Sequence, residues 1–195
     1  MHPERSTQTV DQMDYSLKLI LALSFFVTGN VSVSLGTGVD VIVAAGDPVP
    51  DGAGVFRQFR TPAATGPNNF LFLADLEASS SREGLFQWRD GQLIKVATLG
   101  EQDPSGNGVL GSLGRITEIN QAGTVAFDAR IEIADGSSFE ALFVRQNDQL
   151  FEVVVTDTPF NSFGVARLAS NDDIAFTLQP LPSSGFDSVM CHGAR

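Results

Sequence analysis

Apolar and polar residues alternate over several short segments of this chain, which is the pattern of β-strands with one buried face. The clearest case is residues 124–133, where five apolar positions, Val125, Phe127, Ala129, Ile131 and Ile133, alternate with Thr124, Asp128, Arg130 and Glu132. A period of two places every second side chain on the same side of a strand. This segment therefore predicts a half-buried strand.

Residues 85–97 predict a β-hairpin. The strand-like runs 85–88 and 92–97 are separated by Arg89-Asp90-Gly91. Asp-Gly suits the turns that hairpins prefer, because both residues tolerate positive φ. Residues 46–54 and 100–108 are rich in glycine and proline, which favours surface loops on either side of the hairpin.

Three sequence elements recur in the same order along the chain. Gly46 to Phe56 matches residues 100–110, displaced by 54 residues from Gly46 to Gly100, and Leu85 to Leu93 matches residues 142–150. The third element, Asn-Gln-Ala-Gly-Thr-Val-Ala-Phe at 120–127, returns in shortened form at 171–176 and 68–72. Such regular self-similarity indicates tandem structural units.

Each unit of about 50 residues contains a hairpin, a loop, a short strand and the strand after the Asn turn, which is the content of a propeller blade. The sequence thus predicts an all-β fold of about three tandem four-stranded units over residues 35–190. The arrangement is propeller-like and incomplete, because a closed ring has about four to eight blades. Equivalent inward positions are expected for Phe72, Phe127 and Phe176, and for the pair Phe86 and Phe143.

At these residues the chain resembles the choice-of-anchor tandem repeat proteins containing the NxxGxxAF motif, a family of exported bacterial repeat proteins. Asn120 to Phe127 matches that motif in full, and Gly46 to Gly52 is similar to a second hallmark of the family. The resemblance covers about residues 36–188, although the motif's glycine is absent from 68–72 and 171–176. It implies export and a propeller-like β architecture, and it implies no reaction.

The N-terminal residues 1–34 combine a polar stretch, 1–16, with an apolar stretch, 17–27. Leu19 to Val27 is uncharged, about as long as the core of a signal peptide and too short for a membrane span. We expect export to the cell envelope or medium, and a helix, if any, only near residues 14–28. The alternative is an apolar strand or helix that packs on the domain. Residues 191–195 are expected to form a C-terminal tail.

The formal net charge of −11 argues against nucleic acid and anionic lipid as partners. The single cysteine, Cys191, excludes an internal disulfide and any multi-cysteine metal site. Its neighbour His192 could be a general base, but adjacent strand residues point to opposite faces, so no catalytic dyad is predicted.

Other candidate sites have simpler explanations. Calcium ligands are conceivable at Asp103, Ser105 and Asn107, or at Asp47 and Asp51, but these residue types also form ordinary turns. Asp172-Asp173 could be a hydrolytic carboxylate pair, and Trp88 could stack on a sugar; a solvated turn and core packing are favoured. Glycine-rich segments at 106–108 and 111–114 lack the helix and Lys-Ser/Thr pair of a phosphate loop. Asn30-Val-Ser32 fits a glycosylation acceptor.

No catalytic, cofactor-binding or metal-binding residue is therefore predicted. The expected function is an exported, non-enzymatic repeat protein of the surface or envelope, with a structural role or a role in binding a protein or polysaccharide. The alternatives are a propeller-type carboxylate hydrolase or lyase, and a non-functional fragment of a longer repeat protein. Open edges of the repeat array are expected to cause self-association.

Overall fold

The described residues form strands and turns without a helix, which confirms the predicted all-β class. A computed structural model describes residues 40–50, 54–66, 68–156, 160–181 and 189–193. The apolar segment 17–27, the helix expected near 14–28 and Asn30 lie outside the described residues. No helix within the described ranges is long and apolar enough to cross a membrane.

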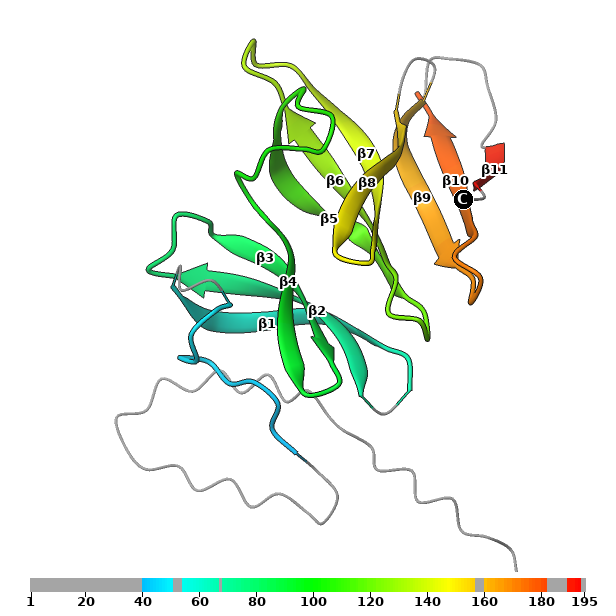
Figure 1. Ribbon diagram of the computed structural model, residues 1–195. Helices are drawn as coiled ribbons and strands as arrows, with labels where there is room; N and C mark the ends of the chain where they lie inside the picture. Colours follow the sequence, from blue (N-terminus) through cyan, green and yellow to red (C-terminus); the bar gives the residue numbers. More distant parts are fainter. Residues whose placement is uncertain (1–39, 51–53, 67, 157–159, 182–188, 194–195) are drawn as a thin grey trace, which may run out of the picture.

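Eleven strands form three antiparallel sheets that follow one another along the chain (Figure 1). The first sheet contains β1 (Val55–Ala64), β2 (Asn69–Glu77), β3 (Glu83–Arg89) and β4 (Gln92–Thr98). The second contains β5 (Val109–Ile119), β6 (Val125–Glu132), β7 (Ser138–Gln146) and β8 (Gln149–Val155). The third contains β9 (Phe160–Leu168), β10 (Ile174–Pro180) and β11 (Val189–Gly193).

Two details differ from the expected four-stranded units. The third sheet has three strands among the described residues, whereas the first two sheets have four each. Strand β11 runs through Cys191 to Gly193 and pairs with β10, so these residues are part of a sheet, not of the C-terminal tail to which the sequence assigned them. Their backbone is anchored by five paired positions, from Ile174 with Gly193 to Leu178 with Val189.

The predicted hairpin is confirmed, and it has a counterpart in the second sheet. Strands β3 and β4 are joined by Asp90-Gly91, with φ of 50° and 84°. Strands β7 and β8 are joined by Asn147-Asp148, with φ of 49° and 62°. Asn, Asp and Gly are the residues that best tolerate this left-handed conformation, so the two different dipeptides make the same kind of tight turn.

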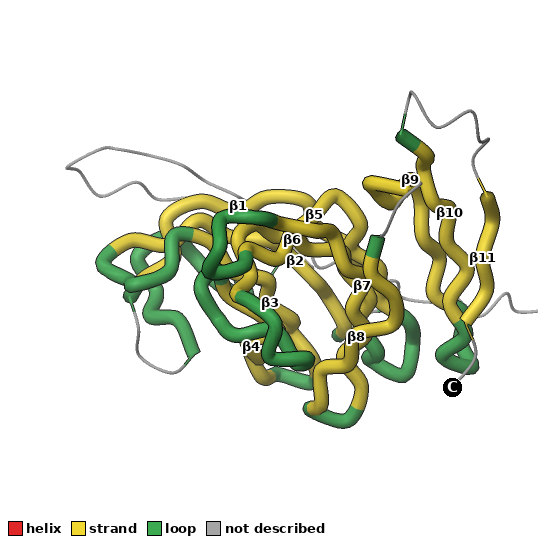
Figure 2. The backbone as a smooth tube through the Cα atoms, turned by 90° about the horizontal axis from the view of Figure 1, so that it is seen from above, coloured by secondary structure: helices red, strands yellow, loops and turns green. Residues whose placement is uncertain are grey.

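Three apolar clusters show how the sheets pack. One lies between the first and second sheets and includes Leu71, Leu85 and Phe127; another lies between the second and third sheets and includes Leu142, Phe163 and Phe176. The remaining cluster lies on the outer face of the first sheet, where Ile42, Val43 and Val49 from the preceding segment cover its phenylalanines. Figure 2 shows the third sheet standing beyond the first two, with β11 outermost.

The expectation of a half-buried strand at 124–133 is wrong for the first part of β6. All residues from Val125 to Ala129 are buried, including Asp128 on the face that was predicted to be solvated. The reason is the position of the second sheet between the other two. Phe127 packs toward the first sheet and Ala126 toward the third, so both faces of the strand are covered.

The predicted inward phenylalanines are confirmed. Phe72 and Phe86 are cross-strand neighbours with ring centroids 6.0 Å apart, and Phe127 and Phe143 repeat this pair at 5.4 Å. Phe176, also buried, meets Phe163 edge-on at 6.0 Å. Each sheet therefore uses phenylalanine at the same register position to fill its packing face.

Replacing Phe127 by Ala should lower the free energy of unfolding by about 3–5 kcal/mol, because a fully buried ring leaves a cavity when it is removed. Urea denaturation followed by circular dichroism would measure this change. As a control, Val165→Ala removes a side chain that is 52% exposed and should change stability by less than about 0.5 kcal/mol. Equal urea midpoints for Phe127→Ala and the wild-type protein would contradict the burial of this ring.

Candidate functional site

The Asn turn at residues 120–123 is the centre of the polar contacts between sheets. The backbone N–H of Gly123 donates to the carbonyl of Asn120, and the N–H of Thr124 donates to the Asn120 side chain at 3.0 Å. Gly123 has φ of 83°, and a Cβ there would lie 2.6 Å from Nη1 of Arg89 in the first sheet. Glycine suits this position because it adopts positive φ without strain and leaves room for the Arg89 side chain of the neighbouring sheet.

The first sheet holds this turn through two buried amide side chains, which we call the first joint. Asn69 Nδ2 donates to the carbonyl oxygen of Asn120 at 3.0 Å. Gln87 Nε2 donates to the carbonyl oxygen of Gly123 at 3.2 Å and to Asn69 Oδ1 at 2.9 Å. Since Gln87 is only 1% exposed, these bonds satisfy polar groups that water cannot reach.

The second sheet holds the turn of the third sheet in the same way, at the second joint. Asn120 Nδ2 donates to the carbonyl oxygen of Ala169 at 2.9 Å and to Asp172 Oδ1 at 2.7 Å. Gln146 Nε2 donates to Asp172 Oδ2 at 2.6 Å. Asn120 therefore fixes its own turn through its oxygen and the next turn through its nitrogen.

The two joints reveal which turn residues correspond. Ala169 precedes Phe176 by the same interval that separates Asn120 from Phe127, and in both joints the carbonyl of this first turn residue accepts an amide N–H. The turn of the third sheet thus begins at Ala169, two residues before Asn171, which the sequence comparison had matched to Asn120. Asp172, with φ of 69°, occupies the place of Gly123.

Asp172 and Asp173 do not converge on one point. The Asp172 carboxylate accepts hydrogen bonds from Thr124, Asn120 and Gln146, and these bonds lower its pKa below the ordinary value. The Asp173 carboxylate instead accepts a bond from Asn171 at 2.8 Å and lies 3.6 Å from His192 Nε2. A general acid at neutral pH needs a raised pKa, and the pKa of Asp172 is lowered. Its hydrogen bonds instead hold the turn before β10 against the second sheet.

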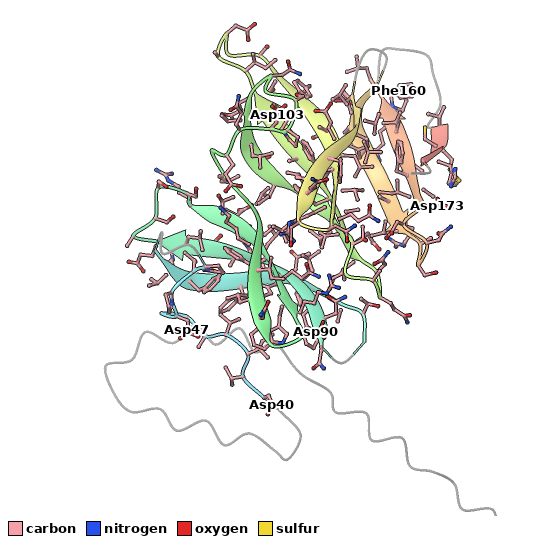
Figure 3. The ribbon with its side chains drawn as sticks, viewed as in Figure 1. Asp40, Asp47, Asp90, Asp103, Phe160 and Asp173 are labelled. Atoms are coloured by element: carbon pink, nitrogen blue, oxygen red, sulfur yellow. The ribbon has the colours of Figure 1, made fainter. Side chains whose placement is uncertain are left out.

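The calcium candidates in the loop 100–108 bond to one another. Asp103 accepts the Ser105 hydroxyl at 2.6 Å, and Ser105 accepts the Asn107 amide at 2.7 Å. In the loop before β1, Asp47 accepts the Ala44 N–H at 2.8 Å, and Asp51 lies outside the described residues. Within the described ranges, His, Cys, Asp and Glu form no group of three that could hold a metal ion. Figure 3 shows Asp47, Asp103 and Asp173 far apart, each beside a different sheet.

Most of this loop is exposed, as the sequence predicts, but Asp103 within it is only 3% exposed. Glu152 of β8 faces it, and among the described residues its enclosed Oε2 atom has no hydrogen-bond partner. Burial, and secondarily the charge of Asp103, raise the pKa of Glu152. Sequence reasoning missed this pair, although a glutamate within the apolar run of β8 is the signal that could have indicated it.

Cys191 and His192 point to opposite sides of β11, as the strand alternation predicts. Cys191 packs against the cluster between the second and third sheets, while the His192 side chain is 61% exposed beside Asp173. Trp88 lies in β3 and is partly buried, with its Nε1 atom enclosed and unpaired among the described residues. Gly111 and Gly114 lie inside strand β5, where a Cβ on Gly114 would collide with the Asp128 side chain.

A cavity of about 410 Å³ lies between the first sheet and the loops around it. Val49, Leu76 and Phe86 supply apolar wall, and Lys95 and Glu101 supply charge. Lys95 Nζ and Glu101 Oε1 are 2.6 Å apart and neutralise each other. Glu101 also accepts the Thr98 N–H, so the ion pair fastens the loop to β4.

Replacing Asn120 by Ala should destabilise the protein by about 3 kcal/mol, since it removes three hydrogen bonds and leaves the buried Thr124 N–H without its acceptor. Asn171→Ala is the matched control. It removes an exposed asparagine whose side chain bonds only within its own turn, and should cost less than about 1 kcal/mol. If urea denaturation gave the same loss of unfolding free energy for both variants, the hydrogen bonds of the second joint would not contribute to stability as expected.

Replacing Glu152 by Gln should raise the thermal midpoint at pH 7. A carboxyl whose pKa is raised on folding stabilises the fold only below its unfolded pKa, and this stabilisation is lost as pH rises through the folded value. The advantage of the variant should therefore shrink as pH falls below about 4.5, the ordinary value for Glu. Calorimetry at values from about pH 3 to about pH 8, below and above this pKa, would measure the change. Glu77→Gln, at an exposed carboxylate, should show no such gain.

Comparisons with known proteins give one match. A family model described as a family of unknown function (DUF7453) matches residues 27–161, which span the first and second sheets and the first joint. No curated protein and no solved structure matches the chain. The match does not address the resemblance to the choice-of-anchor repeat proteins, which stays a prediction. Because the matched residues make up well over half of the chain, the protein belongs to the DUF7453 family.

Proposed function

We propose that this protein is an exported, non-enzymatic structural or binding module of the cell surface or envelope. Its three sheets are successive units of a propeller-like tandem array, and its partner is a protein or a polysaccharide. The negative formal charge of −11 makes nucleic acid an unfavourable partner.

The observation that carries this proposal is the recurrence of the joint. At both sheet boundaries an asparagine of one sheet donates to the carbonyl of the first turn residue in the next sheet. The strand edges follow the same plan, because β1 contacts β5 and β5 contacts β9. A contact that is repeated from unit to unit is the basis of solenoid and propeller stacking.

A scaffold role is also supported by what the polar side chains do. Asn69, Gln87 and Asn120 hold turns, and Asp172 accepts three bonds that keep two sheets together. Asp103 closes its own loop by accepting the Gly108 N–H as well as the Ser105 hydroxyl. The hydrogen bonds of these residues hold turns and loops in place. A carboxylate hydrolase would instead need two carboxylates on either side of the substrate bond that is cleaved.

Export rests on the sequence pattern of residues 17–27 and on the resemblance to exported repeat proteins. We expect a fusion of the full chain to a bacterial alkaline phosphatase to be active in intact cells, because this reporter needs the oxidising compartment outside the cytoplasm. The matched control is the same fusion without residues 1–34, which should be inactive. Equal activity of the two fusions, or none from the full chain, would contradict export.

The non-enzymatic part of the proposal needs its own readout. The purified chain should not turn over glycoside, ester or peptide substrates. Reproducible turnover that Asp173→Asn abolishes, while the circular dichroism spectrum stays unchanged, would overturn it in favour of the carboxylate hydrolase. Because localisation and turnover are measured separately, either part of the proposal can fail alone.

A further inference from the structure

A second cavity lies at the boundary between the second and third sheets. Its volume is about 470 Å³, within the range of about 300–1,000 Å³ that is usual for ligand sites. The second sheet contributes Arg130 from β6 and Glu140 from β7, and the third sheet contributes Phe160 and Asn161 from β9. Figure 3 shows Phe160 at the end of the third sheet away from Asp173. Since Asp173 directly follows the aspartate of the second joint, the cavity and the joint lie at opposite ends of this boundary.

The wall that the second sheet supplies holds a cation beside an anion. Arg130 and Glu140 are cross-strand partners, so their side chains leave the same face of the sheet with Cβ atoms about 4.5–5.5 Å apart. Among the described residues no ion pair joins them, and the Arg130 guanidinium has no hydrogen-bond partner. The Glu140 carboxylate accepts the N–H of Phe163 at 3.4 Å and keeps further acceptor capacity. The wall therefore presents an unpaired donor next to an acceptor.

The corresponding place in the first sheet is closed by ion pairs. Asp75 takes the position of Arg130, because each lies three residues after the inward phenylalanine of its strand. Glu83 takes the position of Glu140, because each lies three residues before such a phenylalanine. Arg60 of β1 binds both of these carboxylates in the first sheet. The second sheet has an arginine in place of one carboxylate, which leaves the charged groups of its wall available to a ligand.

The wall that the third sheet supplies also differs from the first boundary. Phe160 corresponds to Leu110, because each pairs with the residue four places after the inward phenylalanine of the next strand. Leu110 is 1% exposed and belongs to the cluster between the first two sheets, whereas Phe160 is only partly buried. The next residue is Gly111 in the second sheet and Asn161 in the third. At the second boundary an aromatic ring and an amide thus line a hollow.

We infer that this cavity binds a neutral sugar residue of a polysaccharide. A hydroxyl group both donates and accepts hydrogen bonds, so two neighbouring hydroxyls of a sugar accept from Arg130 and donate to Glu140 together. The Asn161 amide supplies a further donor and acceptor. The C–H face of the sugar ring packs on the apolar ring of Phe160. This inference rests on the binding role proposed above and names its partner.

Other ligand classes fit these walls less well. An anion that pairs with Arg130 would lie beside the Glu140 carboxylate, and a cation would meet the opposite conflict. A trans peptide unit directs its N–H and C=O to opposite sides, whereas the donor and acceptor stand side by side on one wall. Peptides that extend a sheet need a free strand edge, and β6 and β7 are each paired on both sides. Adjacent hydroxyls satisfy the wall without these conflicts.

Affinity gel electrophoresis of the full chain tests the inference. Native gels contain dextran, mannan, laminarin or galactan, which are neutral polysaccharides of different linkage, and a further gel contains casein as a protein probe. We expect at least one polysaccharide to slow the chain. Arg130→Ala and Phe160→Ala should each weaken that binding about tenfold or more, because one removes a charged donor and the other the apolar platform. The dependence of mobility on polysaccharide concentration gives the dissociation constant.

Arg57→Ala is the matched control, because it removes an exposed arginine of β1 that lies outside the cavity. It should leave binding unchanged, and circular dichroism should show that all three variants fold. Binding that neither Arg130→Ala nor Phe160→Ala weakens would overturn this site and leave the polysaccharide partner standing. No retardation by any of the polysaccharides, or retardation by casein alone, would overturn the inference itself. Export is measured separately by the phosphatase fusion, so its outcome is independent of these results.

Discussion

The arrangement of the sheets depends on one hydrogen-bonding requirement. The carbonyl oxygen of the first turn residue, Asn120 or Ala169, accepts an N–H of its own turn and also pairs with the side-chain amide that the preceding sheet directs at it. The donor is a side-chain amide of that sheet, from Asn69 at the start of β2 in one joint and from Asn120 in the turn before β6 in the other. A displacement of one sheet along its neighbour would break this bond and leave polar groups unpaired, which costs more than the bond contributes when it is made. The apolar clusters hold the sheets together, and the joints determine their relative position.

The strands of the second sheet differ from ordinary half-buried strands, because this sheet lies between two others. Because β6 lies between two other sheets, Ala126 and Phe127 are both buried, and Asp128 is buried with them. Glycine in the neighbouring strand β5 makes this close packing possible, since Gly114 leaves room for the Asp128 side chain. At the turns, Gly123 leaves room for Arg89, whereas Asp172 in the third sheet adopts the same positive φ and uses its carboxylate to bind the preceding sheet. The same turn position therefore holds a glycine that lets two sheets approach closely in one case, and an aspartate that hydrogen-bonds to the preceding sheet in the other.

Local features could be predicted from the sequence, and long-range features could not. The Asp90-Gly91 hairpin and the register of the buried phenylalanines follow from turn chemistry and alternation within a few residues. The joints depend on pairs such as Asn69 with Asn120, which lie 51 residues apart, and no local pattern marks Gln87 as a buried donor. The first turn residue of the third sheet was misplaced for a related reason. Only its carbonyl takes part in the joint, so alanine at 169 serves as well as asparagine, and matching asparagines pointed to Asn171.

The segment before β1 completes the first unit of the described array. The second sheet is covered on both faces by its neighbours, through the clusters that contain Phe127 and Leu142. Among the described residues, the first sheet has a neighbouring sheet on one face only. On its other face, Ile42, Val43 and Val49 pack against the phenylalanines of the first sheet. A unit that stacks in tandem buries its apolar faces only when something lies against each of them. The segment before β1 therefore does for the first sheet what the first sheet does for the second.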